Sequence, residues 1–151
     1  MASFHYLPWY GEGKSCHLSP IYPPFFDQFS EARQKGFLTV MDLKERGIPL
    51  VGTYCTFMPQ EIPMAAGAVV VSLCSTSDET IEEAEKDLPR NLCPLIKSSY
   101  GFGKTDKCPY FYFSDLVVGE TTCDGKKKMY EYMAEFKPVH VMQLPNSVED
   151  D

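Results

Sequence analysis

The feature that most constrains the fold of this chain is a short, β-branched apolar run, AVVVSLC at residues 68–74. Runs of this length that are apolar on both sides are typical of strands in parallel sheets covered by helices. Parallel strands need long crossover connections, and helical patterns stand on both sides of this run. The apolar runs of the chain also fall far short of the ~20 residues that span a bilayer, so no membrane helix is predicted.

The rest of the chain alternates between helical and extended patterns. The sequence predicts helices over 27–46, 59–67, 77–88 and 123–136, and strands over 48–54, 68–74, 115–120 and 138–144. Ser77 or Asp78 is expected to cap the third helix. The cysteine-rich segment between residues 88 and 115 is assigned no element. This alternation predicts an α/β fold, a Rossmann-like three-layer domain with a mostly parallel sheet.

The N-terminal region has a different composition. Residues 1–26 carry four prolines among many aromatic residues, which predicts an irregular arm packed by its rings. The α/β domain is then expected over 27–151, and the total of 151 residues fits one domain. The first residues lack a basic start and a continuous apolar stretch, so they do not form a signal peptide and the cytoplasm is predicted.

The charge of the chain argues against one class of partner. The formal net charge is −7, and nucleic-acid binding begins with a basic surface, so no nucleic-acid partner is expected. The only basic run is Lys126–Lys127–Lys128. We expect it to be a solvated helix face, with an anion or partner contact as the alternative.

The six cysteines need an explanation in a reducing compartment. There, dispersed cysteines are more often metal-binding or catalytic than disulfide-bonded. No pair has the Cys-x-x-Cys spacing of zinc ribbons. Cys74, at the end of the apolar run, is expected to be a buried packing residue; Cys16 is assigned no role. The cysteines are Cys16, Cys55, Cys74, Cys93, Cys108 and Cys123.

Several cysteines are expected at one edge of the sheet. Cys55 and Cys123 follow predicted strands and Cys74 ends one, and ligands of such sheets gather beyond the carboxyl ends of the strands. Cys123 also opens a helix, whose free N–H groups favour a thiolate. Cys93 and Cys108 each precede a proline, a frequent companion of iron–sulfur ligation.

One long segment carries a family resemblance. LPRNLCPLIKSSYGFGKTDKCPYFYFSDLVVGETTCDGKKKMYEYM, at 88–133, strongly resembles the 2-hydroxyacyl-CoA dehydratase subunit family, which includes benzoyl-CoA reductase subunits. GTYCTFMPQEIPMAAG at 52–67 and PVHVMQLPN at 138–146 fit the same family. KTDKCPYFYFSD resembles its double-cubane cluster branch. The likeness covers about 48–151.

The resemblance implies an iron–sulfur cofactor, either a 4Fe–4S cluster or a double-cubane 8Fe–9S cluster. Cys93 and Cys123 match family cluster ligands, and Cys55 and Cys108 are candidates for the additional cluster. Glu61, in a Pro-x-Glu pattern, is the candidate acid/base group near the open iron. A carboxylate that only begins a helix is the alternative for Glu61.

The resemblance also implies partners. An ATP-dependent activator, itself an iron–sulfur protein, would deliver a low-potential electron. The substrate would be an acyl-CoA, and the full-length form a homodimer. The family has a second domain that this chain lacks and that supplies the remaining cluster cysteines. We therefore expect this chain to be inactive alone and unable to hold a complete cluster. The alternatives are a non-catalytic metal- or partner-binding α/β module and a plain α/β domain whose cysteines pack.

Overall fold

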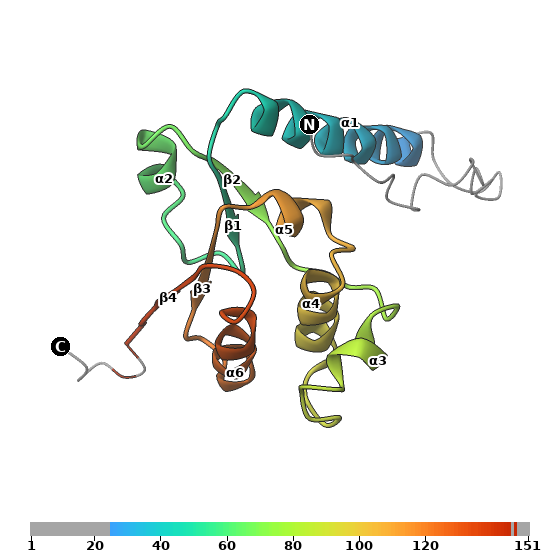
Figure 1. Ribbon diagram of the computed structural model, residues 1–151, viewed down its shortest axis with the longest axis vertical. Coiled ribbons are helices and arrows are strands. Elements are labelled where there is room, and N and C mark those ends of the chain that lie inside the picture. The colour runs from blue at the N-terminus through green and yellow to red at the C-terminus, as the bar shows by residue number, and fades with distance from the viewer. Residues whose placement is uncertain (1–24, 146, 148–151) are drawn as a thin grey trace. The chain divides into compact units, whose positions relative to one another are not determined.

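The computed structural model describes residues 25–145 and 147 (Figure 1). The predicted arm over 1–26 therefore lies outside the described residues up to residue 24, and so does Cys16. The first described helix, α1 (Phe25–Glu45), confirms the helix expected over 27–46. The chain divides into two units between Gln34 and Lys35, and all the features considered below belong to the second.

The second unit is built on a four-stranded sheet in the order β2-β1-β3-β4, and all three strand pairs are parallel. The four strands confirm those expected from the sequence, each slightly shortened. Central strands β1 and β3 are almost wholly buried, whereas β2, with the longest apolar run, is an edge strand that is half-buried. The strands are β1 (Leu50–Thr53), β2 (Val69–Ser72), β3 (Leu116–Glu120) and β4 (Val139–Met142).

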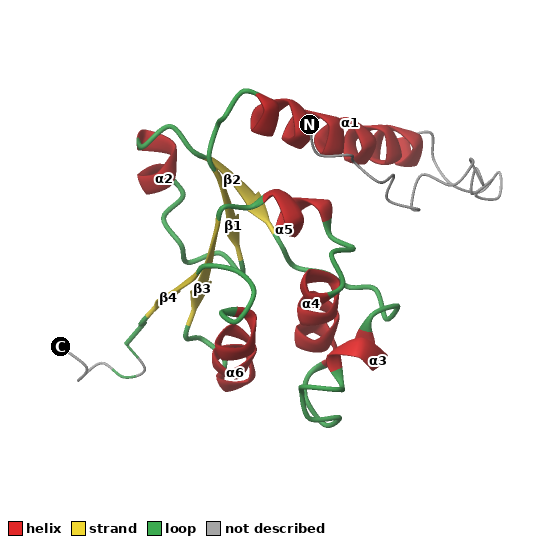
Figure 2. Ribbon diagram, viewed as in Figure 1, coloured by secondary structure: helices red, strands yellow, loops and turns green. Residues whose placement is uncertain are grey.

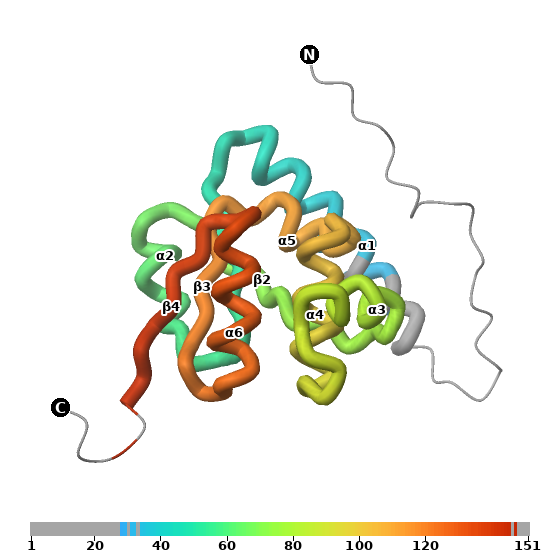
Figure 3. Tube along the Cα trace, turned by 60° about the horizontal axis from the view of Figure 1, so that its bottom comes forward, coloured from blue at the N-terminus to red at the C-terminus, as the bar shows by residue number. Residues whose placement is uncertain are grey.

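Helices lie on both sides of this sheet (Figures 1 and 3). The crossover between β1 and β2 places the short α2 on one side, and α4, α5 and α6 lie on the other. This arrangement is the α/β architecture predicted from the alternation of patterns. The helices are α2 (Glu61–Ala65), α3 (Ile81–Ala84), α4 (Pro94–Lys104), α5 (Pro109–Phe113) and α6 (Asp124–Met133).

Two local expectations were wrong. The helix predicted over 77–88 shrinks to the single turn α3 with Thr80 as its N-cap, in place of Ser77 or Asp78. The Ser77 hydroxyl instead accepts a hydrogen bond from the backbone N of Glu79 at 3.3 Å. The segment left without elements forms α4 and α5, as Figure 2 shows.

Both unexpected helices begin with Cys-Pro. Pro94 and Pro109 stand at the first helical positions, and Cys93 and Cys108 are the N-caps. Proline suits this place because its fixed φ is helical and the N–H it lacks would have no partner within the helix.

The core lies between the sheet and the helices α4, α5 and α6. The aromatic rings of Tyr54 and Tyr130 meet there, with centroids 6.0 Å apart. Across the described residues, no helix is long and apolar enough to cross a membrane. The buried members of the core are Tyr54, Leu73, Ala84, Leu88, Ile96, Tyr100, Phe111, Val117, Met129, Tyr130 and Met133.

Candidate functional site

The parallel sheet brings three cysteines to its carboxyl edge. Cys55 stands two residues after β1, Cys74 two residues after β2 and Cys123 three residues after β3. Because the strands all run the same way, these residues leave the sheet on the same side, which the sequence spacing predicted.

Two helices begin side by side at this edge. Cys93 is the N-cap of α4 and Cys123 is the N-cap of α6. The first turns of these helices pack directly, since a Cβ on Gly125 would lie 2.8 Å from Leu92 Cδ1 and 2.9 Å from Ile96 Cδ1. The starts of both helices, and with them Cys93 and Cys123, therefore belong to one small region.

A lysine of α6 reaches a third thiol. Lys126 Nζ donates a hydrogen bond to Cys55 Sγ. Cys55 has a φ of 65°, in the left-handed region that a residue with a Cβ seldom adopts. Burial lowers the pKa of Lys126. The contact links the loop after β1 to the first turn of α6.

The lysine run is thus only in part a solvated face. Lys127 pairs with Asp124 at 3.1 Å, and Lys128 pairs with Glu131 on the surface of α6. Lys126 points the other way and contacts Cys55, which corrects the expectation for that residue.

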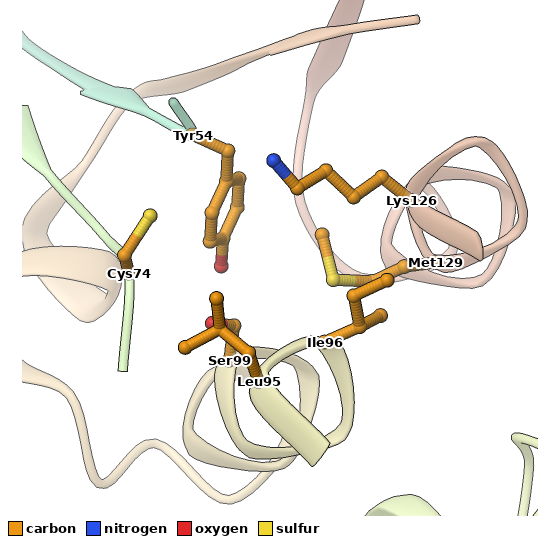
Figure 4. Close-up of a pocket in the computed structure, with 7 residues that line it drawn as sticks. All are labelled: Tyr54, Cys74, Leu95, Ile96, Ser99, Lys126 and Met129. Carbon is orange, nitrogen blue, oxygen red and sulfur yellow. The ribbon is translucent and has the colours of Figure 1, made fainter. Parts of the chain in front are cut away.

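Cys74 is exposed, so its prediction as a buried packing residue was wrong. Partial burial of the thiol still raises its pKa, and the nearby Glu120 adds to this, against a hydrogen bond with Ser72. Figure 4 shows Cys74 on one side of the Tyr54 ring and Lys126 on the other. The small pocket there is lined by Tyr54, Cys74, Leu95, Ile96, Ser99, Lys126 and Met129.

Cys108 stands at the opposite end of α4 from Cys93, although its thiol, like that of Cys74, adds to the raised pKa of Tyr54, which is due first to burial. Cys108 follows the last turn of α4, whereas Cys93 precedes its first, and the 11 residues of α4 are about 16 Å long. Cys108 Sγ accepts a hydrogen bond from Phe111 N at 3.4 Å. Burial raises the pKa of the Cys108 thiol.

Glu61 begins α2, a helix of five residues, and is exposed. It is not among the residues that line the pocket beside Cys74. The structure therefore leaves its predicted acid/base role as a prediction.

The sequence reasoning missed a buried carboxylate at the same edge. Glu120, the last residue of β3, is 1% exposed. Its Oε2 accepts a hydrogen bond from Phe57 N at 3.1 Å, and its Oε1 accepts one from Thr122 Oγ1 at 3.1 Å. The available signal was an acidic residue that ends an apolar strand, where a charge is expensive unless it is hydrogen-bonded.

A neighbouring phenol belongs to the same edge. Tyr130 Oη accepts a hydrogen bond from the backbone N of Glu120 at 3.3 Å. Burial raises the pKa of Tyr130 to about 12, and the Glu120, Cys74 and Cys123 side chains lie close enough to add to the rise. Tyr130 therefore stays neutral, and its hydroxyl oxygen is a hydrogen-bond acceptor for the backbone of Glu120.

The donor set suits iron–sulfur ligation in chemical kind, because thiolate sulfur is the usual ligand of these clusters. Lys126 lies beside one of these thiols, Cys55. Within residues 25–145, however, no three His, Cys, Asp or Glu side chains are grouped closely enough to hold a metal ion.

Fold and site together define an α/β domain with an all-parallel sheet and thiols gathered at its carboxyl edge. Residues 55–151 match the model of the family described as 2-hydroxyglutaryl-CoA dehydratase, D-component. This chain belongs to that family, as the resemblance at 88–133 predicted.

A curated relative is very close in sequence. The Escherichia coli (strain K12) protein named "Putative dehydratase subunit YjiM" is 97% identical over 129 residues. The match covers 85% of this chain and 34% of that protein, so the chain spans about a third of the length of its relative.

Proposed function

We propose that this domain supplies part of the thiolate ligand set of an iron–sulfur cluster in a 2-hydroxyacyl-CoA dehydratase-like enzyme. The observation that carries the proposal is the position of Cys93 and Cys123 at the starts of two packed helices. Cys55 is the third thiol, because Lys126 links its loop to the same helix start. The second domain implied by the family supplies the remaining ligands.

The surroundings of these thiols support ligation. A thiolate is stabilised by the unpaired N–H groups at the start of a helix and by a neighbouring ammonium group. Cys93 and Cys123 have the first kind of neighbour and Cys55 has the second. These neighbours are of the kinds found beside cysteine ligands of metal clusters.

The remaining parts of the proposal follow from family membership. When bound, the cluster, 4Fe–4S or double-cubane, supplies one-electron chemistry at low potential. The electron comes from an ATP-dependent activator that is itself an iron–sulfur protein, and the acceptor is an acyl-CoA. The enzyme acts as a homodimer in its full-length form. The name of the E. coli relative supports dehydration as the class of reaction.

Anaerobic reconstitution with iron and sulfide tests this function. The chain is expected to develop broad visible absorption that bleaches in air, with fewer irons than a complete cluster. Cys93→Ser or Cys123→Ser should abolish the absorption, whereas the matched variant Cys74→Ser should keep it.

Other results would contradict the proposal. A colourless chain with stoichiometric zinc would identify a metal- or partner-binding module. A chain that takes up no metal would identify an α/β domain whose cysteines only pack.

Cys108→Ser separates the cluster types: unchanged iron content favours a single cluster at this edge, and reduced iron content favours the double-cubane form.

A further inference from the structure

The buried carboxylate of Glu120 joins two loops of the candidate site. Glu120 ends β3, and its Oε2 accepts a hydrogen bond from Phe57 N, two residues beyond Cys55. Its Oε1 accepts a hydrogen bond from Thr122 Oγ1, next to Cys123. One side chain therefore connects the loop that carries Cys55 with the loop that carries Cys123.

The Cys55 loop needs such a connection. Cys55 holds a left-handed backbone conformation, which is disfavoured for any residue with a Cβ and persists only where its surroundings impose it. The side chain of Phe57 is 64% exposed, so apolar packing of that ring does not hold the loop. The hydrogen bond from Phe57 N to Glu120 restrains this backbone after Cys55, as the one from Tyr54 N to Val118 O at 3.0 Å does before it.

Holding a loop with a buried carboxylate costs free energy of desolvation. Burying one costs free energy even when it is hydrogen-bonded, and an apolar side chain of similar size would often stabilise a fold better. Glu120 is 1% exposed, and its two oxygens accept hydrogen bonds from two different loops. Its length and its acceptors therefore matter more here than its contribution to packing.

We infer that Glu120 is a positioning residue, which holds the Cys55 loop so that Cys55 Sγ stays beside Lys126 at the carboxyl edge. The inference rests on the proposed function, in which Cys55 is a cluster thiol. It adds a supporting residue that is not among the proposed ligands and that acts through Phe57 N.

The loop of Cys74 offers an internal control, because it is held in another way. The backbone N of Ser75 donates a hydrogen bond to Ser99 Oγ at 3.1 Å, and Ser98 Oγ donates one to Ser75 Oγ at 3.0 Å. These contacts fasten the Cys74 loop to α4 without Glu120. A change at Glu120 should therefore leave residues 73–77 unaffected.

Two variants of Glu120 separate the effect of its side-chain length from the effect of its charge. Glu120→Gln keeps the length and an acceptor for Phe57 N, and its amide can donate to Thr122 Oγ1, but the charge is lost. Glu120→Asp keeps the charge but is one methylene shorter. Backbone hydrogen exchange, followed by mass spectrometry, compares residues 54–58 with residues 73–77, and iron uptake is measured on the same samples.

If Glu120 positions the Cys55 loop, the two variants should differ in exchange at Phe57 and in iron uptake. Glu120→Asp should speed exchange at Phe57 by about tenfold or more, the loss expected for a charge-assisted hydrogen bond, and should reduce iron uptake. Glu120→Gln should speed exchange at Phe57 by about 2–5-fold, clearly less than Glu120→Asp, since both contacts are remade as neutral hydrogen bonds and only the assistance of the charge is lost. Ser99→Ala should speed exchange in 73–77 alone.

Several outcomes would overturn the inference. If Glu120→Gln speeds exchange at Phe57 as much as Glu120→Asp does, the length of the side chain does not decide how the loop is held, and the positioning role is refuted. If either variant speeds exchange equally in both segments, Glu120 only stabilises the fold. Should Glu120→Asp fail to fold, Glu120→Met decides, because it keeps a side chain of similar length but offers no oxygen to Phe57 N; unchanged exchange at Phe57 would then refute positioning.

The exchange measurement needs no iron. Failure of the natural chain to take up iron would therefore contradict the proposed function, whereas unchanged exchange at Phe57 in Glu120→Asp would contradict the positioning role. The two failures are distinguishable.

Discussion

At the scale of single residues, the cysteines of this domain differ in their neighbours. Cys55 receives a hydrogen bond from Lys126, and Cys93 is exposed at the start of α4. Burial raises the pKa of the thiols of Cys74 and Cys108. Since the thiolate is the form that acts as ligand and nucleophile, the raised pKa values mark Cys74 and Cys108 as the thiols that resist ionisation.

Gly119 is a position where one added carbon has a large effect. A Cβ there would lie 2.3 Å from Tyr130 Cζ, inside a packed core. Gly119→Ala is expected to lower the free energy of unfolding by about 1–3 kcal/mol, because the ring of Tyr130 must move. Urea unfolding measures the change.

The double variant Gly119→Ala/Tyr130→Leu provides the control. Because the smaller side chain leaves room for the new Cβ, the two changes should be non-additive, and the alanine should cost less in this background. Equal costs in both backgrounds would show that the contact with Tyr130 is not the cause.

At the scale of elements, α4 is fastened to the segment that follows α3. Tyr100 Oη donates a hydrogen bond to Asp87 Oδ2 at 2.6 Å, and Lys104 Nζ binds the same oxygen. The hydrogen bond from Lys104, followed by that from Tyr100, lowers the pKa of Asp87. This contact holds α4 by its side chains while its first turn packs against α6.

The lowered pKa gives a pH dependence. The charged Asp87 stabilises the fold fully above the ordinary pKa of an aspartate, and this contribution is lost as the pH falls through the lowered value. Asp87→Asn is therefore expected to lower the free energy of unfolding by about 1 kcal/mol at neutral pH, and by less in acid. Urea unfolding across acidic pH tests this, and a difference that does not change with pH would contradict it.

At the scale of the whole unit, stability comes from the core between the sheet and helices α4, α5 and α6. Leu88 belongs to it and is 1% exposed, whereas Leu95 is 44% exposed. Leu88→Ala removes the same atoms from the core that Leu95→Ala removes from the surface. The pair therefore measures what burial in this core contributes.

Leu88→Ala is expected to lower the free energy of unfolding by about 2–5 kcal/mol, a large share of the 5–15 kcal/mol typical of a domain. Leu95→Ala is expected to cost less than about 1 kcal/mol. Chemical unfolding followed by two spectroscopic probes gives both values. Similar costs for the two variants would mean that the core is not packed as described.

Much of the fold was readable from local patterns. The alternation of helical and β-branched segments predicted the parallel sheet, because residue periodicity depends only on near neighbours. The same alternation placed Cys55, Cys74 and Cys123 at one edge, since the carboxyl ends of parallel strands meet there.

The sequence did not predict helix α4, because some of its residues are set by tertiary packing and not by helix propensity. Gly101 and Gly103 weaken its helical pattern. A Cβ on Gly101 would lie 2.3 Å from Thr80 O, so close packing against the chain before α3 requires glycine at this place. Local propensity disfavours a helix at this place, but the packing of Gly101 against Thr80 requires the glycine and the helix forms.

The sequence by itself determined the α/β class, the parallel sheet, the family and the edge where the thiols gather, because periodicity, strand direction and motif are properties of the linear chain. Only the tertiary structure decided that Cys74 is exposed, that Lys126 reaches Cys55 and that Glu120 is buried between two loops. These facts depend on which distant loops meet, and that follows from packing of the whole unit, which no local pattern encodes.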